Sequence, residues 1–373
     1  MNPVLEDILD TQFALRQRLR NRKHHLSKSS IPLEDLTEEL EPEIRPFLQA
    51  LAAELCKDPN SILTETYSQN ERARDYLQLQ HKEVLENNEI LPIDTRSKPG
   101  HKILDHYMKH FWDVKNHKGV SLRSLITQDN LEKALFANLR NHSTPYCSEI
   151  RRMLIMYGGM GSVTKYKGIT TKALVTYFQA KSILDPCVGW GGRMLGTLAA
   201  FPDTTYVGFE PDKNTFSALL QILKDEAIPE ATRKRAALFK EPAEIGLQKN
   251  IGPFDMILTS PPYFNLEVYT SGQQSIQTYK TWDEWVSKWL KPVILRCLSL
   301  LKPGGVSCWS VKNFRSDKLY PLADVTKKIH KDVGWELVKT VRVTGSARMG
   351  AKRIQDGKEG RESEEETFCF RKV

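Results

Sequence analysis

The second half of the chain alternates short apolar segments with helical ones, and this alternation constrains its fold more than any other feature. Seven segments have the length and composition of strands: 182–186, 204–210, 236–242, 254–260, 306–311, 335–343 and 367–373. Most are separated by apolar residues at helical spacing, as in 214–227 and 281–301. Strands joined by helices form parallel crossovers, so the sequence predicts an α/β fold with a seven-stranded, doubly wound sheet.

The predicted sheet indicates where a ligand binds. No helical pattern separates the last two strands, only residues 344–366, so we expect these strands to be antiparallel neighbours. Open sheets of this type bind ligands at the carboxyl ends of their parallel strands. The residues that follow 182–186, 204–210 and 254–260 are therefore the first candidates for a functional site.

The first half of the chain has a different pattern. Residues 1–150 contain no β-rich run, and segments such as 46–56, 103–112 and 131–139 place apolar residues at helical spacing. We expect two domains, a mostly helical one at 1–150 and the α/β domain at 151–373. The sequence of the helical domain does not reveal its role.

Charge and composition restrict the partners of the chain. The first 95 of its 373 residues carry 18 acidic and 11 basic side chains, whereas the remainder carries 43 basic against 28 acidic. A basic body favours a polyanionic partner such as nucleic acid, and the alternative is simply a soluble protein with a high pI.

Other sequence features exclude several classes of protein. No run of 18 apolar residues predicts a membrane helix, and the first thirty residues lack the apolar region of a secretory signal. The six cysteines are scattered without a C-x-x-C pair, which argues against disulfides and a zinc site. We therefore expect a cytoplasmic protein without a metal.

An acidic, glycine-rich segment, D-P-C-V-G-W-G-G, follows the first predicted strand at 185–192. Its glycines allow a tight turn and close approach to a ligand, although their spacing is not the G-x-G-x-x-G of pyrophosphate sites. An aspartate here would repel a phosphate and would suit a cationic ligand such as a sulfonium or an amine. A purely structural glycine turn is the alternative. The candidate binding residues are Asp185, Pro186, Cys187, Gly189 and Gly191.

Acidic residues follow the next two strands. Glu210 lies about twenty positions beyond the glycine segment, where a carboxylate usually holds a ribose diol. Asp212 is instead suited to cap the helix that begins near Asn214. Glu241 follows the third strand and either lines the adenine side of the same pocket or belongs to an ordinary surface loop.

The fourth strand ends in Ser260-Pro261-Pro262-Tyr263. Two consecutive prolines remove two backbone donors and fix two φ angles, so this loop is stiff and offers acceptors only. The Ser260 hydroxyl and the Pro261 carbonyl are suited to accept both hydrogens of a planar amino group while Tyr263 stacks on its ring. Taken alone, the tetrapeptide is also compatible with an ordinary proline turn.

Together these segments resemble the S-adenosylmethionine-dependent DNA methyltransferases that produce N6-methyladenine or N4-methylcytosine. The resemblance covers about residues 150–373 and implies a Rossmann-like methyltransferase domain. It implies that 185–192 cradles the methionine part of the cofactor and that Glu210 holds its ribose. It also implies that the tetrapeptide 260–263 is catalytic, acting on a base flipped out of double-stranded DNA.

The chemistry of the reaction agrees with this resemblance. An exocyclic amine is a poor nucleophile because its lone pair is delocalised into the ring. Acceptors on both N–H bonds favour a pyramidal nitrogen and stabilise the positive charge that develops during transfer. Methylation at cytosine C5 would instead require a cysteine nucleophile, and the tetrapeptide loop contains none.

Two departures from the family pattern concern the target base and the cofactor. The tetrapeptide begins with Ser260 rather than Asp or Asn, which within the family favours N4 of cytosine without deciding it. The segment 158–178 occupies the place of a further cofactor motif but matches it loosely. It adds Lys165, Lys167 and Thr170 as weaker candidates.

The residues that hold DNA are predicted outside these motifs. The segment 344–366 offers Arg348, Lys352 and Arg353 for phosphates, or is a solvated hairpin whose acids cancel its charge. Target recognition is otherwise expected from 1–150 or 264–280, because the seventh strand ends the chain. An RNA base methyltransferase and a non-catalytic nucleic-acid-binding protein on the same scaffold are the alternative functions.

Overall fold

The computed structural model describes residues 41–94, 98–140, 146–158, 164–269, 272, 274–344 and 365–373. These residues form two compact units. The smaller contains the described residues up to Glu65 and those from Lys109 to Gly158. The larger contains the described residues of Thr66–Met108 and of Thr164–Val373.

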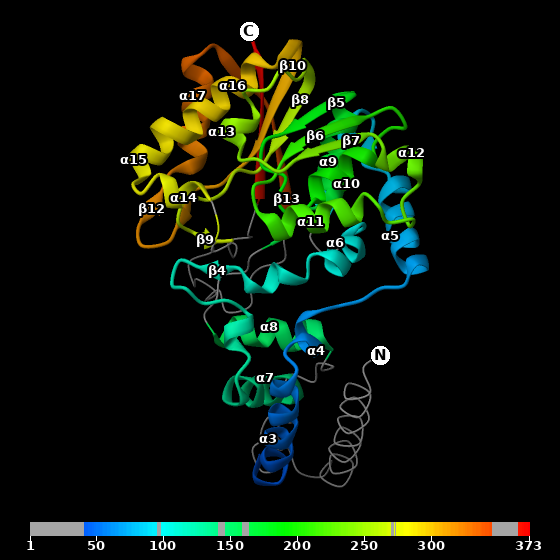
Figure 1. Ribbon diagram of the computed structural model, residues 1–373, viewed down its shortest axis with the longest axis vertical. Coiled ribbons are helices and arrows are strands. Elements are labelled where there is room, and N and C mark those ends of the chain that lie inside the picture. The colour runs from blue at the N-terminus through cyan, green and yellow to red at the C-terminus, as the bar shows by residue number, and fades with distance from the viewer. Residues whose placement is uncertain are drawn as a thin grey trace. The chain divides into compact units, whose positions relative to one another are not determined.

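An eight-stranded sheet forms the centre of the larger unit, in the order β3-β13-β14-β10-β8-β5-β6-β7 (Figure 1). Its strands are β3 (Ile93–Asp94), β5 (Ser182–Asp185), β6 (Thr205–Phe209), β7 (Ala236–Phe239), β8 (Phe254–Thr259), β10 (Leu301–Ser310), β13 (Trp335–Thr344) and β14 (Glu365–Lys372). Neighbours are parallel except at β14, which is antiparallel to both β10 and β13. All seven predicted strands and the Rossmann-like α/β fold are confirmed. The two-residue edge strand β3 is additional.

Helices cover this sheet in two groups. One group packs α10 against α9 and β6, and the other packs α16 against α13, α17 and β10 (Figure 1). The helices are α5 (Gln69–His81), α6 (His101–Tyr107), α9 (Gly168–Tyr177), α10 (Gly192–Leu198), α11 (Lys213–Ile222), α12 (Glu230–Arg233), α13 (Ala243–Gly246), α14 (Ser275–Thr278), α15 (Trp282–Trp285), α16 (Lys291–Ser299) and α17 (Leu322–Asp332). A π-helical turn, η3 (Val286–Leu290), joins α15 to α16.

Short two-residue strands complete the larger unit. They are β1 (Leu85–Glu86), β2 (Glu89–Ile90), β9 (Glu267–Val268), β11 (Phe314–Arg315) and β12 (Leu319–Tyr320). β1 pairs with β2 and β11 pairs with β12, each antiparallel. The β11–β12 hairpin directly follows the central strand β10 along the chain.

An aromatic core lies beneath the carboxyl end of β8. Three tryptophans of the segment 281–301 pack here, with the buried Trp285 stacked between Trp282 and Trp289 at centroid distances of 5.5 and 5.0 Å. Phe264, which follows the proline tetrapeptide, is 5% exposed and packs against Trp282 and Trp285. The chain after β8 is therefore anchored in the core immediately beyond Tyr263.

The smaller unit is mostly helical, as its sequence indicates. Its elements are α3 (Glu41–Lys57), α4 (Asn60–Leu63), η1 (Lys109–Asp113), β4 (Lys115–Asn116), η2 (Arg123–Leu125), α7 (Gln128–Arg140) and α8 (Cys147–Tyr157). Leucines from α3 and α7 form its buried core, among them Leu55 and Leu135. None of the helices among the described residues combines the length and the apolarity needed to cross a bilayer.

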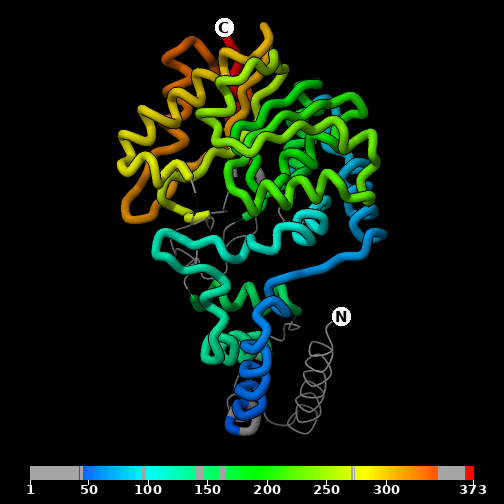
Figure 2. Tube along the Cα trace, in the orientation of Figure 1, coloured from blue at the N-terminus to red at the C-terminus, as the bar shows by residue number. Residues whose placement is uncertain are grey.

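The division into units does not fall at residue 150, because Thr66–Met108 packs with the sheet. The Lys172 ammonium of α9 donates to the carbonyl oxygens of Leu79 and Lys82 at 3.1 and 2.7 Å, at the carboxyl end of α5. Arg72 of α5 forms a bidentate ion pair with Asp225, with N···O distances of 2.7 and 3.1 Å. Figure 2 shows the blue trace of α5 beside the green segments that follow residue 164.

Candidate active site

The loops that follow β5, β6 and β7 are joined to one another at the carboxyl edge of the sheet. The Val188 N–H donates to the carbonyl oxygen of Phe209 at 3.0 Å. The Glu210 N–H donates in turn to the carbonyl oxygen of Phe239 at 3.0 Å. The predicted cofactor residues therefore meet at this edge, as expected for parallel strands.

Asp185 is the hydrogen-bonding centre of the glycine-rich loop. It is fully buried, and its carboxylate accepts hydrogen bonds from four groups. The donors are Thr259 Oγ1 at 2.8 Å, Cys187 N–H at 3.1 Å, Tyr206 Oη at 2.7 Å and Arg193 Nε at 2.7 Å. The negative charge that the sequence suggested for a cationic ligand is thus matched by Arg193, and the carboxylate orders the loop from within.

Arg193 of α10 is the buried counter-charge of Asp185. Its guanidinium also donates to the carbonyl oxygens of Cys187 and Val188, and it lies 5.0 Å above the ring centroid of Tyr166. Burial disfavours the charged form, but the charge and hydrogen bond of Asp185 together with Tyr206 and Tyr166 outweigh it and raise the pKa of Arg193. This pair was not predicted, although a single arginine beside the apolar residues of α10 was a sequence signal that could have indicated it.

The glycines of the loop have two different roles. Gly191 has φ +85°, and a Cβ there would lie 2.8 Å from Leu219 Cδ2, so close packing requires glycine. Gly189 also has a positive φ, +57°, but a Cβ added to it would meet nothing within 4 Å. Open space therefore lies beside Gly189, where a ligand can approach the backbone.

Pro186 and Cys187 are the remaining predicted cofactor residues of the loop. Pro186 is buried, and the Cys187 side chain packs against the aromatic core. Burial raises the pKa of the Cys187 thiol well above its ordinary value. A protonated, packed thiol is not a nucleophile, in agreement with the absence of cysteine from the tetrapeptide.

Glu210 reaches back to the glycine-rich loop. One carboxylate oxygen accepts from the Gly189 N–H and the other from the Asp212 N–H, both at 2.9 Å. Glu210 is 8% exposed, and mainly this burial raises its pKa to about 7, against the two backbone donors. Asp212 accepts from the Thr215 N–H at 2.8 Å, so its predicted role as the cap of α11 is confirmed.

Glu241 has one satisfied and one unsatisfied oxygen. Its Oε1 lies 3.0 Å from Lys249 Nζ. Its Oε2 is buried and has no hydrogen-bond partner among the described residues. Buried polar atoms are nearly always paired in native proteins, so this oxygen is suited to receive a donor from a ligand.

The proline tetrapeptide presents free acceptors beside a fixed aromatic ring. Within the described part of the chain, the Ser260 hydroxyl and the Pro261 carbonyl have no hydrogen-bond partner. The Tyr263 hydroxyl accepts from the Lys312 N–H at 3.1 Å, and its ring meets Phe314 edge-on at 5.4 Å. The loop therefore combines free hydrogen-bond acceptors with an aromatic ring whose position is fixed by its neighbours. The sequence predicted this combination for binding a planar amino group.

The weaker cofactor candidates lie in the segment that leads into α9, beside the glycine-rich loop, since a Cβ at Gly192 would come within 1.9 Å of the Tyr166 carbonyl oxygen. Lys165 donates to Asp105 at 2.6 Å, Lys167 precedes α9 and Thr170 is buried within that helix. Arg348, Lys352 and Arg353 lie outside the described residues. The described residues contain no group of three His, Cys, Asp or Glu side chains able to hold a metal ion.

The sequence reasoning missed Thr259, Tyr206 and the backbone of Lys312. Thr259 and Tyr206 both donate to Asp185, from β8 and β6. A threonine at a strand end and a tyrosine within a strand are common in core positions, so no sequence signal distinguished them.

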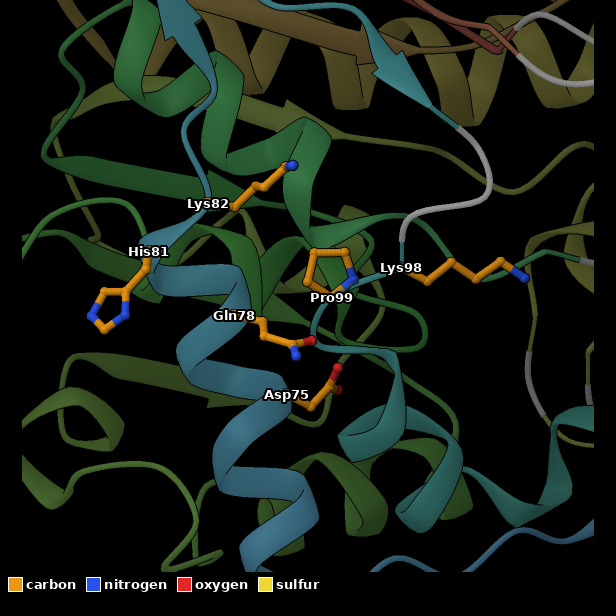
Figure 3. A pocket seen from close by; sticks show the side chains of 6 residues that line it. All are labelled: Asp75, Gln78, His81, Lys82, Lys98 and Pro99. Carbon is orange, nitrogen blue, oxygen red and sulfur yellow. The ribbon is translucent and has the colours of Figure 1, made fainter.

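A separate cavity lies beside α5. It has a volume of about 500 Å³ and is lined by Asp75, Gln78, His81, Lys82, Lys98 and Pro99. Figure 3 shows Asp75 and Gln78 directed toward Pro99, with Lys98 extending away. The Lys102 N–H donates to Asp75 at 2.8 Å. None of the residues predicted to bind cofactor or substrate lines this cavity.

Comparison with solved structures returns methyltransferases at low similarity. TrmN from Thermus thermophilus is 14% identical over 56% of this chain and 49% of its own, with a TM-score of 0.37. This match therefore spans about half the length of TrmN. A putative rRNA methylase from Clostridium thermocellum is 10% identical over 57% of this chain and 98% of its own, with a TM-score of 0.35.

The sequence comparisons agree with the predicted family. No curated protein matches the chain. Residues 254–372 match the family described as DNA methylase, N6_N4_Mtase, a segment that begins with β8 and contains the tetrapeptide. This match supports the predicted resemblance, and S-adenosylmethionine is the methyl donor that the resemblance implies. The part of the chain that is similar to the N6/N4 DNA methylase family is therefore residues 254–372.

Proposed function

We propose that the protein transfers a methyl group from S-adenosylmethionine to the exocyclic amine of a base flipped out of double-stranded DNA. The target is N4 of cytosine or N6 of adenine. The observation that carries the proposal is the pair of free acceptors at Ser260 and Pro261 beside the fixed ring of Tyr263. An amino group has two N–H donors, and this pair of acceptors matches them.

The cofactor fits the groups at the carboxyl edge of the sheet. S-adenosylmethionine supplies an activated methyl group on a sulfonium centre. The Glu210 carboxylate would hold the ribose hydroxyls, and the unpaired Glu241 Oε2 would accept from the adenine amine. The open space beside Gly189 leaves room for the methionine part next to the loop backbone. Asp185 contributes by holding this loop in shape.

The acceptors activate the amine electrostatically. Hydrogen bonds from the amine to Ser260 Oγ and to the Pro261 carbonyl would localise the nitrogen lone pair away from the ring. They also stabilise the positive charge that grows on nitrogen as the methyl group arrives. The prolines keep the hydrogen-bond acceptors in place without reorganisation. Correct orientation of the methyl donor relative to the amine supplies further acceleration.

Tyr263 would stack on the extruded base. A base flipped out of a duplex loses its stacking, and an aromatic ring in the enzyme replaces part of it. The Lys312 N–H holds the Tyr263 hydroxyl, and Phe314 supports its ring, so the stacking surface is oriented in advance.

The remaining parts of the proposal concern partners and location. We propose that the described helices of the smaller unit and the segment 344–366, with Arg348, Lys352 and Arg353, take part in DNA recognition. The cysteines among the described residues are free thiols, which fits the reducing cytoplasm.

The test is incubation with labelled S-adenosylmethionine and either duplex DNA or RNA, followed by nucleoside analysis. The expected product is N4-methylcytosine or N6-methyladenine in DNA, and its loss in the Ser260→Ala protein. Methylated nucleosides in RNA alone would replace DNA by RNA as the substrate. Binding of nucleic acid without any methylated nucleoside would show a non-catalytic protein.

A further inference from the structure

The hairpin that follows β10 is hydrogen-bonded to the tetrapeptide loop and to the residues directly after it. Residues 312–320, here called the β11–β12 hairpin, pair Phe314 with Tyr320 and Arg315 with Leu319. Asn265, two residues beyond Tyr263, donates from Nδ2 to Asp317 Oδ1 at 2.8 Å.

Two contacts at the base of the hairpin reinforce this connection. The Ser316 hydroxyl donates to Asn265 Oδ1 at 2.7 Å. The Lys312 N–H donates to the Tyr263 hydroxyl at 3.1 Å. The hairpin and the proline loop therefore form one connected structure, so a group carried on the hairpin has a defined position relative to the loop.

The inner face of the hairpin is apolar and buried. Phe314 and Tyr320 are 5% and 3% exposed and stack on each other with centroids 5.2 Å apart. Both contact Trp282, and Phe314 also meets the ring of Tyr263. The residues between them in the ladder, Arg315 and Leu319, are exposed.

The hairpin carries three basic side chains. Arg315 and Lys318 are exposed, Lys312 is half-buried, and Lys318 Nζ lies 5.4 Å from the ring centroid of Tyr320. None of the three forms an ion pair with a described residue. The one acid of the hairpin, Asp317, accepts hydrogen bonds from the neutral side chains of Asn265, Ser316 and Tyr320 and keeps its negative charge. The hairpin therefore carries three cations against one anion, an excess of positive charge.

We propose that the β11–β12 hairpin binds the phosphates that flank the target nucleotide, through Lys312, Arg315 and Lys318. This inference rests on the proposed function, because it assigns a binding surface to the same nucleic-acid substrate. A flipped-out nucleotide stays attached to the strand through the phosphates on both its sides. Those phosphates must lie beside the loop that holds the base. The hairpin is hydrogen-bonded to Tyr263 of that loop and to Asn265 just beyond it. Lysine and arginine are the usual phosphate-binding side chains.

The test is the full-length protein with Lys312→Ala, Arg315→Ala and Lys318→Ala combined. We expect DNA affinity to fall at least tenfold and the log–log salt slope to become shallower by about 2.7, since each neutralised phosphate contributes about 0.9. Affinity for S-adenosylmethionine should not change, because none of the three side chains contacts the cofactor loops. A second protein with Lys312→Arg, Arg315→Lys and Lys318→Arg should retain most of the affinity, which separates charge from folding.

A matched control removes three exposed cations elsewhere on the larger unit: Lys224→Ala, Lys331→Ala and Lys372→Ala. Lys331 and Lys372 lie by the start of β13, at the amino edge of the parallel strands, and Lys224 lies just beyond α11. The proposal requires the hairpin variant to lose much more affinity and slope than this control. Equal effects of the two variants, in a protein that still methylates nucleic acid, would overturn the hairpin as binding surface and leave the proposed function intact. A wild-type protein that neither binds nor methylates nucleic acid would overturn both.

Discussion

Thr259 donates a hydrogen bond of 2.8 Å to Asp185, across the boundary between β8 and β5. Thr259 is the residue before the tetrapeptide, and Asp185 is the first residue of the glycine-rich loop. Both are fully buried. One buried hydrogen bond therefore joins the loop proposed to hold the methyl donor to the loop proposed to hold the acceptor base.

The first prediction concerns the Asp185–Arg193 pair. Asp185→Asn keeps the size of the side chain but leaves the buried Arg193 guanidinium without its counter-charge. We expect a loss of about 3 kcal/mol in the free energy of unfolding, measured by urea denaturation. Asp203→Asn, which breaks the exposed pair with Lys181, is the control and should cost much less. Equal losses in the two variants would contradict the central role of Asp185.

The second prediction uses two glycines with similar backbones. Gly189→Ala and Gly334→Ala both place a Cβ at a positive φ, +57° and +80°, with nothing within 4 Å. Each should cost about 1 kcal/mol of stability through strain. Only Gly189→Ala should weaken the binding of S-adenosylmethionine, by at least about tenfold, or 1.4 kcal/mol, in calorimetry. Unchanged binding in Gly189→Ala would move the cofactor away from this loop.

The third prediction is a pH dependence set by Glu210. Burial raises its pKa to about 7, so the acceptor form of the carboxylate is only partly populated at neutral pH. Affinity for S-adenosylmethionine should rise between pH 6 and pH 8, and Glu210→Gln should show weaker, pH-independent binding. The raised pKa also means that the stability contributed by the protonated carboxyl is lost as the pH rises through about 7. A wild-type affinity that is flat over this range would exclude Glu210 as the ribose ligand.

The fourth prediction separates the parts of the tetrapeptide. Ser260→Ala and Tyr263→Ala should each lower turnover at least about tenfold, which corresponds to roughly 1.4 kcal/mol of barrier. Tyr263→Phe should lose less, because it keeps the stacking ring and removes only the hydroxyl that accepts from Lys312. Cofactor affinity serves as the control and should stay constant in all three. Full methylation by both alanine variants would show that this loop is not catalytic.

The fifth prediction concerns acid stability. His330 is fully buried between Thr326 and Ser307, and burial lowers its pKa to about 4. The unfolded chain binds a proton near pH 6.5 and the folded one does not, so stability is lost as the pH falls from 6.5 towards 4, by up to about 3 kcal/mol. His330→Gln should reduce this loss in denaturation curves at pH 7 and pH 5. An unchanged difference between the two pH values would exclude His330 as its source.

The sequence predicted the sheet well because strand patterns and motif positions are local. The seven strands, the cap at Asp212 and the antiparallel last pair follow from short segments read in order. The contacts that shape the site join distant positions instead. Tyr206 and Thr259 reach Asp185 from 21 and 74 residues away. No local pattern reports such contacts.

The interpretation of the Asp185 charge shows the same limit in physical terms. An aspartate at a strand end looks available to a cationic ligand until its counter-charge is known, and that counter-charge, Arg193, lies in the first turn of α10, directly after the glycine-rich loop. The sequence also assigned Thr66–Met108 to the helical N-terminal half, again because only local patterns were available. Helical spacing predicts helices such as α5 correctly, but it carries no information on which unit a helix packs against.

The course of the chain between the two units has a practical consequence for anyone dividing this protein into fragments. The chain leaves the sheet-containing unit after Met108 and re-enters it at Thr164, so the stretch between them is an insertion into that unit. A fragment cut at residue 150 would discard α5, and the Lys172 ammonium would lose the carbonyl oxygens of Leu79 and Lys82. An excised catalytic core should therefore start near Thr66 and replace the insertion by a short linker, whereas the inserted helices fold only together with α3 and α4, which precede Thr66.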